Sequence, residues 1–296
     1  MSAPVSLSNH VAPIAFTLFL WWFSTGAILY LDGLRPRTFR WSLGAASVVA
    51  LGALYALRVT SEDTSASAMY CAFTCTILIW GWVEMAFLMG FVTGPRTSPC
   101  PAGARGWRRA GFAFETIAYH EIALLIAGVI IAIITWEAPN LLGLHSFAVL
   151  WISRQSTKLN LFLGVRNLSE EFLPTHLRYL ESYFTRSPMN LLFPLSVSAG
   201  TCGAALLWNA ALADGIAAST SISLSFLATL LTLALLEHWF LVAPINVSAL
   251  WNWSLGNRVS QDVTTDPTYK PDSSMRVTTA LSDESSAQTE LCHSRL

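Results

Sequence analysis

The sequence predicts an all-α membrane protein, a polytopic bundle of about seven transmembrane helices with an additional amphipathic helix on the cytoplasmic side. Hydrophobic residues make up 53% of the 296 residues and charged residues only 12%. Several apolar runs exceed about 18 residues, the length that a helix needs to cross a bilayer. Because each backbone group inside lipid needs an internal partner, and these runs are too long for barrel strands, the spans must be helices.

Seven apolar runs are separated by short connections that contain Pro, Gly or charged residues. The first run lacks the basic region and cleavage pattern of a removable signal, so we expect it to stay in the membrane. The predicted spans are 11–31, 41–57, 68–92, 111–136, 141–165, 189–212 and 222–242. A further re-entrant or interfacial element is expected near 249–255, where Trp251 and Trp253 suit interfacial anchors.

Composition divides the chain into two parts. Residues 1–258 contain all the apolar runs and are expected to form the transmembrane bundle. Residues 259–296 are rich in Ser, Thr and Asp and have almost no apolar clustering. Such a segment cannot offset its ordering entropy by burial, so we expect a disordered Ser/Thr-rich cytoplasmic tail.

The lysines and arginines outside the spans alternate between loops. The first, third and fifth loops hold three, four and three of them, whereas the second, fourth and sixth loops together hold only Arg58. Loops rich in Lys and Arg stay in the cytoplasm. The alternation predicts that the N-terminus is outside and that the C-terminus is inside.

The segment after the fifth span is amphipathic. Its apolar residues recur at three- and four-residue spacing, whereas charged residues occupy the other faces. We expect a helix that lies on the cytoplasmic membrane surface and is kinked or divided at Pro174. Docking of a partner is the alternative role for this helix. The apolar positions are Leu168, Phe172, Leu177, Leu180 and Phe184.

Four spans carry ionisable residues at a similar predicted depth, in the cytoplasmic half of the membrane. With a rise of about 1.5 Å per residue, Glu84 lies about 12 Å from the end of its span and Arg154 about 17 Å. A cation inside a span costs roughly 2.5–3.5 kcal/mol and therefore needs a partner or a functional reason. The residues that share this depth are Glu84, His120, Glu121, Arg154, Lys158, Glu237 and His238.

This polar set has a structural and a functional interpretation. In the structural one, Glu84, Glu121 and Glu237 are counter-ions to the two cations of the fifth span, and the ion pairs determine helix register. In the functional one, the same three carboxylates could hold a metal pair, as in di-iron bundles. His120 or His238 could instead ligate the magnesium of a chlorin or the iron of a haem.

A cofactor site would include further polar residues of the fifth span. Arg154 and Lys158 are four residues apart and so share a helix face. Asn160 adds an amide that could contact a head group or a ring substituent. The candidate cofactor-binding residues are His120, His238, Arg154, Lys158 and Asn160.

Several common sites are not indicated. The five cysteines form no CxxC pair or regular framework, so neither a structural zinc site nor a disulfide scaffold is predicted. There is no Gly-rich phosphate loop and no HExxH motif, and the spans contain no Glu-x-x-His pair. We therefore assign no catalytic residue and favour a role other than an enzyme. No nucleic-acid partner is expected.

Four motifs carry a resemblance to a known family. They are YHE at 119–121, RQSTKLNLFLGVRNLSEEFLPTHLRYLESYF from Arg154, MNLLFP at 189–194 and LEHWFLVAP at 236–244. Together they resemble the photosynthetic complex assembly protein 2 family, PuhE, of anoxygenic phototrophic bacteria. The resemblance covers about residues 13–256, and its long central motif is specific, whereas YHE is not. Where the family is expected to have a Pro-Asp-containing run, this chain has Ile245-Asn246-Val247-Ser248, which puts any role of that acidic residue in doubt.

The resemblance implies a multi-pass protein of the bacterial inner membrane, encoded near the reaction-centre H subunit. It implies an assembly factor for reaction-centre and light-harvesting complexes that acts through bacteriochlorophyll supply. The expected partners are the lipid bilayer and the subunits of these complexes, and the candidate cofactor is bacteriochlorophyll or another tetrapyrrole. Two alternatives are a metal- or haem-dependent membrane enzyme that acts on a tetrapyrrole or isoprenoid, and a structural subunit of a membrane complex.

Overall fold

The computed structural model describes residues 8–168, 170–245 and 247–255, and within these ranges the chain is helical without a β-strand. The predicted all-α fold class is thus confirmed. The predicted tail, 259–296, lies outside the described residues. The long helices are α1 (Ser8–Asp32), α2 (Phe39–Ser61), α3 (Ala66–Leu88), α4 (Gly106–Ile134), α5 (Leu142–Leu163), α6 (Leu192–Ala211) and α7 (Ala218–Phe240). Short 3-10 helices are η1 (Pro36–Thr38), η2 (Glu170–Phe172), η3 (Thr175–Tyr183) and η4 (Val247–Trp251).

Each predicted span coincides with one long helix, although the bounds differ from the prediction by up to five residues. We predicted that the third span ends at Val92, whereas α3 ends at Leu88. Gly90 has a φ of 81°, a left-handed conformation that commonly follows the last turn of a helix. The fourth helix begins at Gly106, five residues before its predicted start at Gly111.

Within the described residues, five helices are long and apolar enough to cross a membrane: α1, α2, α3, α4 and α7. Helices α5 and α6 fall outside this set. Helix α5 carries Arg154, Gln155 and Lys158, and α6 contains two Gly, two Ser and one Asn. The protein is therefore a membrane protein by composition, and the count of seven spans stays a prediction for α5 and α6.

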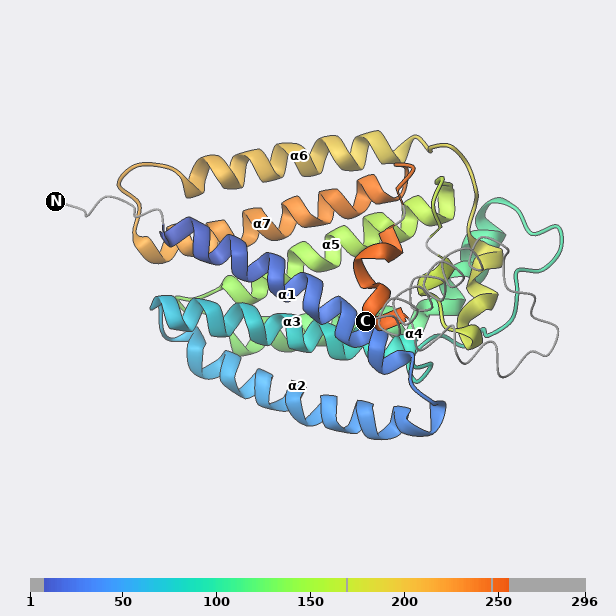
Figure 1. The fold of residues 1–296 in the computed structure, drawn as a ribbon, viewed down its shortest axis with the longest axis horizontal. Helices are drawn as coiled ribbons and strands as arrows, with labels where there is room; N and C mark the ends of the chain where they lie inside the picture. The colour runs from blue at the N-terminus through green and yellow to red at the C-terminus, as the bar shows by residue number, and fades with distance from the viewer. Residues whose placement is uncertain (1–7, 169, 246, 256–296) are drawn as a thin grey trace, which may run out of the picture. The chain divides into compact units, whose positions relative to one another are not determined.

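Helix α3 lies at the centre of the bundle and contacts α1, α2, α4, α5 and α7 (Figure 1). Its buried side chains point in all directions, as expected for a helix that is hydrophobic all round. Phe73 stacks on Phe226 of α7 with 4.5 Å between the ring centroids. A second group of core residues, which includes Val83, Leu124 and Phe147, joins α3 to α4 and α5.

Helix α6 lies at the edge of the bundle and packs mainly on α7 (Figure 1). Gly200 and Gly203 allow the close approach. A Cβ atom at Gly200 would lie 2.5 Å from Cδ2 of Leu235, and one at Gly203 would lie 3.2 Å from Cδ2 of Leu231. Small residues at such contacts let membrane helices pack closely.

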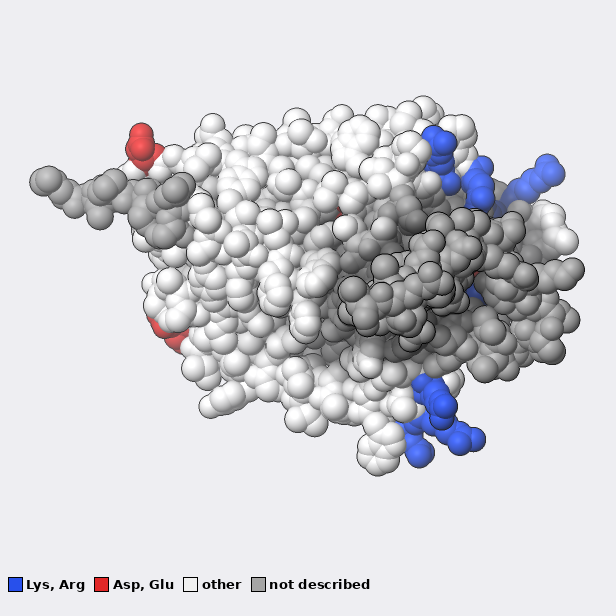
Figure 2. All heavy atoms as spheres, in the orientation of Figure 1, with Lys and Arg blue, Asp and Glu red and all other residues white. Residues whose placement is uncertain are grey.

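Successive long helices run in opposite directions, so the ends of α3, α5 and α7 lie together (Figure 1). Figure 2 shows that lysine and arginine side chains gather at this end, whereas the acidic side chains visible on the same face lie mostly at the other. We call the end where the lysine and arginine side chains gather the basic end. The separation of charge agrees with the predicted alternation of loops, and the N-out, C-in orientation stays a prediction.

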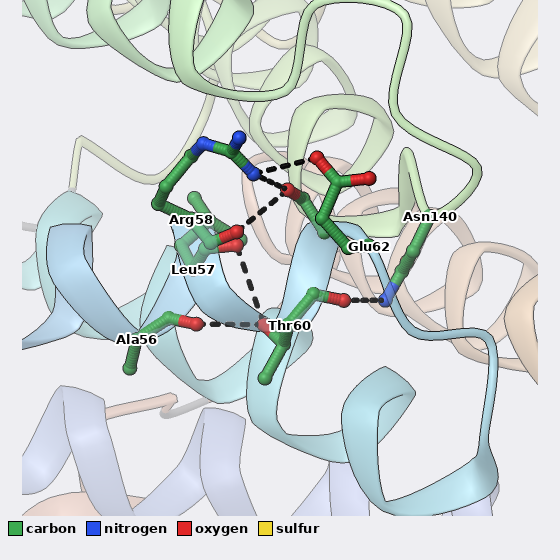
Figure 3. Close-up of polar contacts among 7 residues, drawn as sticks. Ala56, Leu57, Arg58, Thr60, Glu62 and Asn140 are labelled. Carbon is green, nitrogen blue, oxygen red and sulfur yellow. Dashed lines mark hydrogen bonds and ion pairs between the residues drawn. The ribbon is translucent and has the colours of Figure 1, made fainter.

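At the opposite end, Asn140 joins the connection between α4 and α5 to the connection between α2 and α3 (Figure 3). Its side-chain amide donates to the carbonyl oxygens of Thr60 and Asp63, both at 3.1 Å. Nearby, Arg58 forms an ion pair with Glu62 at 2.6 Å. The backbone N–H and the hydroxyl of Ser65 donate to Asp63 and lower the pKa of its carboxyl group.

The amphipathic segment after α5 differs from the prediction in its contacts. Pro174 divides it, as predicted, into η2 and η3. However, Leu177 and Leu180 are buried against Phe87 of α3 and its neighbours. Because protein covers these side chains, this apolar face is not available to lipid, and the interpretation as a helix on the membrane surface is wrong for η3.

The predicted element near 249–255 is helical and includes η4. Trp251 is buried, its ring contacts Trp21 of α1, and its Nε1 donates to the carbonyl oxygen of Trp22 at 3.0 Å. Trp251 is therefore a packing residue and not an interfacial anchor. Trp253 is about half exposed and lies against Gly26 of α1.

Candidate functional site

Two ion pairs join α3, α4 and α5 inside the bundle. Arg154 of α5 donates from an Nη atom to Glu84 of α3 at 3.1 Å. One helical turn further on, Lys158 donates to Glu121 of α4 at 2.5 Å. Gln155 donates to the second oxygen of Glu121 at 2.6 Å. We call these five residues, together with His120, the polar cluster.

His120 completes the polar cluster next to Glu84. Its Nε2 atom lies 3.9 Å from Glu84 Oε1, too far for a hydrogen bond but close enough for electrostatic attraction if the ring is charged. The His120 side chain is 1% exposed, and its ring centroid lies 4.6 Å from that of Phe87. The imidazole is therefore enclosed by protein.

The residues of the polar cluster lie at different distances from the ends of their helices. Glu84 lies four residues before Leu88, or about 6 Å from the end of α3, compared with the expected 12 Å or so. His120 lies fourteen residues after Gly106, or about 21 Å from the start of α4. Because the two residues are neighbours, α4 extends about 15 Å beyond α3 at the basic end.

The connection between α3 and α4 holds His120 in place through its backbone. The His120 N–H donates to the carbonyl oxygen of Thr93 at 3.0 Å, and Arg96 N–H donates to the carbonyl oxygen of Glu115 at 3.3 Å. Gly94 lies directly on the α4 backbone, where a Cβ atom would be 2.0 Å from the Glu115 carbonyl oxygen. We call this contact the loop clamp.

Glu237 and His238 of α7 lie beside the polar cluster and have their own partners. Trp21 of α1 donates to Glu237 at 2.6 Å. The two ring nitrogens of His238 lie 2.7 Å from the carbonyl oxygen of Ala234 and 2.8 Å from the hydroxyl of Ser156. Within the described residues, Glu237 is therefore held by a tryptophan and not by the expected ion pair with a cation of α5.

Asn160 has a structural position at the end of α5. Its side-chain amide donates to the carbonyl oxygen of Ser156 at 2.9 Å and to the hydroxyl of Ser196 of α6 at 3.3 Å. Asn190 donates to the side-chain oxygen of Asn160 at 3.0 Å. Asn160 is fully buried, so it joins α5 to the start of α6 and has no free amide for a ligand.

Four buried polar atoms near the cluster have no hydrogen-bond partner among the described residues. Two are N–H donors of α5, namely Nε1 of Trp151 and Nε of Arg154. The other two are Oε1 of Glu84 and Nδ1 of His120. Because the two donors are three residues apart, they share one face of the helix. Buried polar atoms without partners are costly, which makes this face a place where a polar group could be bound.

The expected metal and pigment sites fit this geometry poorly. Within the described ranges, no group of three or more His, Cys, Asp or Glu side chains could hold a metal ion. Glu84 and Glu121 face cations, and Glu237 faces Trp21. His238 uses both ring nitrogens, and the ring of His120 is enclosed. The residues present therefore do not fit a di-metal centre or axial ligation of a macrocycle.

Sequence reasoning found the ionisable members of the cluster but missed their uncharged partners. Gln155, Ser156 and Trp151 all lie in α5 and contact or adjoin the predicted residues. Their position in the sequence could have indicated them, since Gln155 and Ser156 lie between Arg154 and Lys158 in an apolar helix. The role of Gly94 had no comparable signal, because it depends on the contact between two distant segments.

Comparisons with known proteins were consistent with each other. A family model described as a protein of unknown function, DUF3623, matches residues 7–262. A Rhodobacter capsulatus protein described as an "Uncharacterized 30.4 kDa protein in puhA 5'region" is 39% identical over 245 residues, which cover 81% of this chain and 88% of that protein. No solved structure matches the chain significantly.

Proposed function

Because the chain belongs to the DUF3623 family, we propose that it is an inner-membrane assembly factor for the bacterial photosynthetic complex, the role that its resemblance to PuhE implies. The position of the Rhodobacter capsulatus relative in the puhA 5' region supports this proposal, since it suggests a gene cluster for photosynthesis. The clients would be subunits of the reaction centre or the light-harvesting complexes.

The observation that carries the proposal is the exposure and hydrogen bonding of the Arg154 side chain. Its side chain pairs with Glu84 but is 41% exposed, and its Nε atom is buried without a partner among the described residues. Lipid tails cannot satisfy a guanidinium in this position, because they carry no hydrogen-bond acceptor. Arg154 therefore suits a contact point for a polar group of a client inside the membrane.

Complementation of a deletion strain tests this function. A phototrophic bacterium that lacks the gene would be complemented with the wild type, with Arg154→Gln, or with Arg58→Gln as a control at the opposite end of the bundle. We expect the near-infrared absorbance of reaction-centre and light-harvesting complexes to fall in the deletion strain and in Arg154→Gln, at equal membrane levels of the protein. The control should restore it. Normal complexes in the deletion strain would overturn the proposal.

A bacteriochlorophyll-type pigment is the second candidate client, favoured by the two unpartnered N–H groups of α5. Trp151 and Arg154 could donate to carbonyl substituents at the edge of such a ring. We propose no ligation of its magnesium, because neither histidine fits that role. Purified protein should then carry a pigment that is retained in His238→Phe and lost in Trp151→Phe. Loss with His238→Phe alone would contradict the edge-binding geometry.

A further inference from the structure

A pocket opens at the basic end, outside the polar cluster, where α5 and α7 finish. It has a volume of about 570 Å³ and is lined by Arg166, Asn167, Arg186, Ser187, Pro188 and Val242. Two of these residues are cations, and Pro188 and Val242 supply an apolar wall. A second, smaller pocket shares Arg166, Asn167 and Arg186 with it.

The backbone brings the two arginines together from segments 20 residues apart. An isolated parallel bridge pairs Val165 with Arg186. Its hydrogen bonds run from Val165 N–H to the carbonyl oxygen of Thr185 and from Ser187 N–H to the carbonyl oxygen of Val165, both at 3.1 Å. The arginine side chains therefore start from ordered backbone and not from a loose loop.

Asn167 ties this bridge to the end of α7. Its backbone N–H donates to the carbonyl oxygen of Leu241 at 2.9 Å, and its side-chain amide donates to that of Phe240 at 2.7 Å. The amide also contacts the Ala243 carbonyl oxygen at 2.5 Å. These bonds use carbonyl oxygens at the end of α7, and the charged residues in the lining of the larger pocket are the two arginines.

The charges of the two arginines are only partly balanced. Arg186 pairs with Glu170 at 2.9 Å, and both side chains are well exposed. No ion pair of Arg166 is recorded within the described part of the chain, and its side chain lies at the surface. Among the described residues that line the two pockets, two cations and one carboxylate leave a net positive charge.

We propose that this pocket binds the phosphate group of an anionic membrane lipid. Guanidinium groups match phosphate oxygens through paired N–H donors, and basic pockets between membrane helices on the cytoplasmic side bind such head groups. The apolar wall of Pro188 and Val242 suits the glycerol and the first acyl carbons. The site is independent of the proposed assembly role, since it uses no residue of the polar cluster.

Lipid binding to the purified full-length protein in a neutral detergent tests the site. The probes are phosphatidylglycerol, phosphatidylcholine and inorganic phosphate, and the readouts are lipids retained in native mass spectrometry and the shift in Tm. We expect phosphatidylglycerol to bind and raise Tm. Arg166→Gln and Arg186→Gln should each weaken its binding roughly tenfold, as expected for the loss of a hydrogen bond to a charged group.

Two further variants separate this site from general charge attraction. Glu170→Gln removes the carboxylate that competes for Arg186, so it should tighten phosphatidylglycerol binding. Arg108→Gln removes an exposed arginine near the start of α4, outside the pocket, and should leave binding unchanged. An arginine-dependent Tm shift with inorganic phosphate alone would support the phosphate site but assign it to a free phosphate. Equal binding of phosphatidylcholine, or equal loss with Arg108→Gln, would overturn the proposal.

Discussion

Arg154 and Glu84 form an ion pair in which the glutamate is buried more deeply than the arginine. The Glu84 side chain is only 9% exposed, whereas that of Arg154 is 41% exposed. Removing the arginine would leave a buried carboxylate without its cation, which costs more than the pair contributes. The pair is therefore better tested by a double-mutant cycle than by one substitution.

We expect Arg154→Leu to lower the free energy of unfolding by about 3 kcal/mol. This loss is at the low end of the range for breaking a buried ion pair, because Arg154 is partly exposed. Adding Glu84→Gln to Arg154→Leu should restore more than half of this loss. The measurement is unfolding in detergent or lipid, with Arg58→Leu as a control at an exposed pair, where roughly 0.5 kcal/mol or less is expected. Additive losses for the two substitutions would show that the pair does not couple.

The loop clamp predicts that Gly94 tolerates no side chain. In Gly94→Ala the new Cβ would meet the backbone oxygen of Glu115. Because backbone cannot move aside as a side chain can, we expect a loss of about 1–3 kcal/mol, seen as a lower Tm. Gly111→Ala in α4, where a Cβ meets nothing within 4 Å, is the matched control and should be neutral or slightly stabilising. An unchanged Tm in Gly94→Ala would mean that the clamp is looser than described.

At this scale the sequence predicted which residues carry charge in the membrane, but not how they pair. Glu84, His120 and Glu121 could be placed in one half of the bilayer from helix length alone. Their partners depend on how far each helix is shifted along its axis, and the shift of α4 against α3 comes from the loop clamp. A periodic pattern contains no information about such a shift.

Among the elements, α6 is the helix that lies at the edge of the bundle. It packs mainly on α7, and its contact depends on the missing side chain at Gly200. A Cβ at Gly200 would meet Cδ2 of Leu235, which is the far end of a flexible side chain. A small side chain at Gly200 can therefore be accommodated, whereas a branched one cannot. The edge position makes α6 the helix that can be displaced with the least effect on the rest.

We therefore expect Gly200→Val to separate α6 from α7, seen as faster proteolysis in the α6–α7 connection while the polar cluster keeps its stability. Combining it with Leu235→Ala should restore protection, because the smaller side chain leaves room for the added methyl groups. If the double variant is cleaved as fast as Gly200→Val, the contact at Leu235 is not the cause.

The amphipathic segment shows why an element can be predicted while its role is not. Spacing of Leu177 and Leu180 correctly indicated one apolar face, and Pro174 correctly indicated a division. What covers an apolar face is decided by tertiary contacts, and here Phe87 and its neighbours cover it. The same pattern would suit a membrane surface, so the sequence alone could not distinguish the two.

For the whole molecule, the separation of charge between the two ends supports the predicted orientation, which labelling can test (Figure 2). Cys100, in the α3–α4 connection, is expected in the cytoplasm. A variant that keeps only this cysteine should react with a membrane-impermeant maleimide after permeabilisation but not in intact cells. The cysteines replaced by alanine are Cys71, Cys75, Cys202 and Cys292.

The reciprocal variant places a cysteine at the opposite end. Asp214→Cys, in the exposed α6–α7 connection, should react in intact cells when all five native cysteines are replaced. The same behaviour of both variants would contradict the predicted orientation. Opposite behaviour would mean that an odd number of the three helices between Cys100 and Asp214 crosses the membrane, as expected if α4, α5 and α6 all do.

The loop clamp also has a consequence for hydrogen exchange. In an ordinary helix, a backbone amide exchanges with solvent deuterium only when its own helix unwinds. The His120 amide also donates to Thr93, a residue in the connection before α4. Its exchange therefore also requires that this connection lifts away. One amide deep in α4 thus reports, on a scale of minutes to hours, the opening of a segment at the membrane surface.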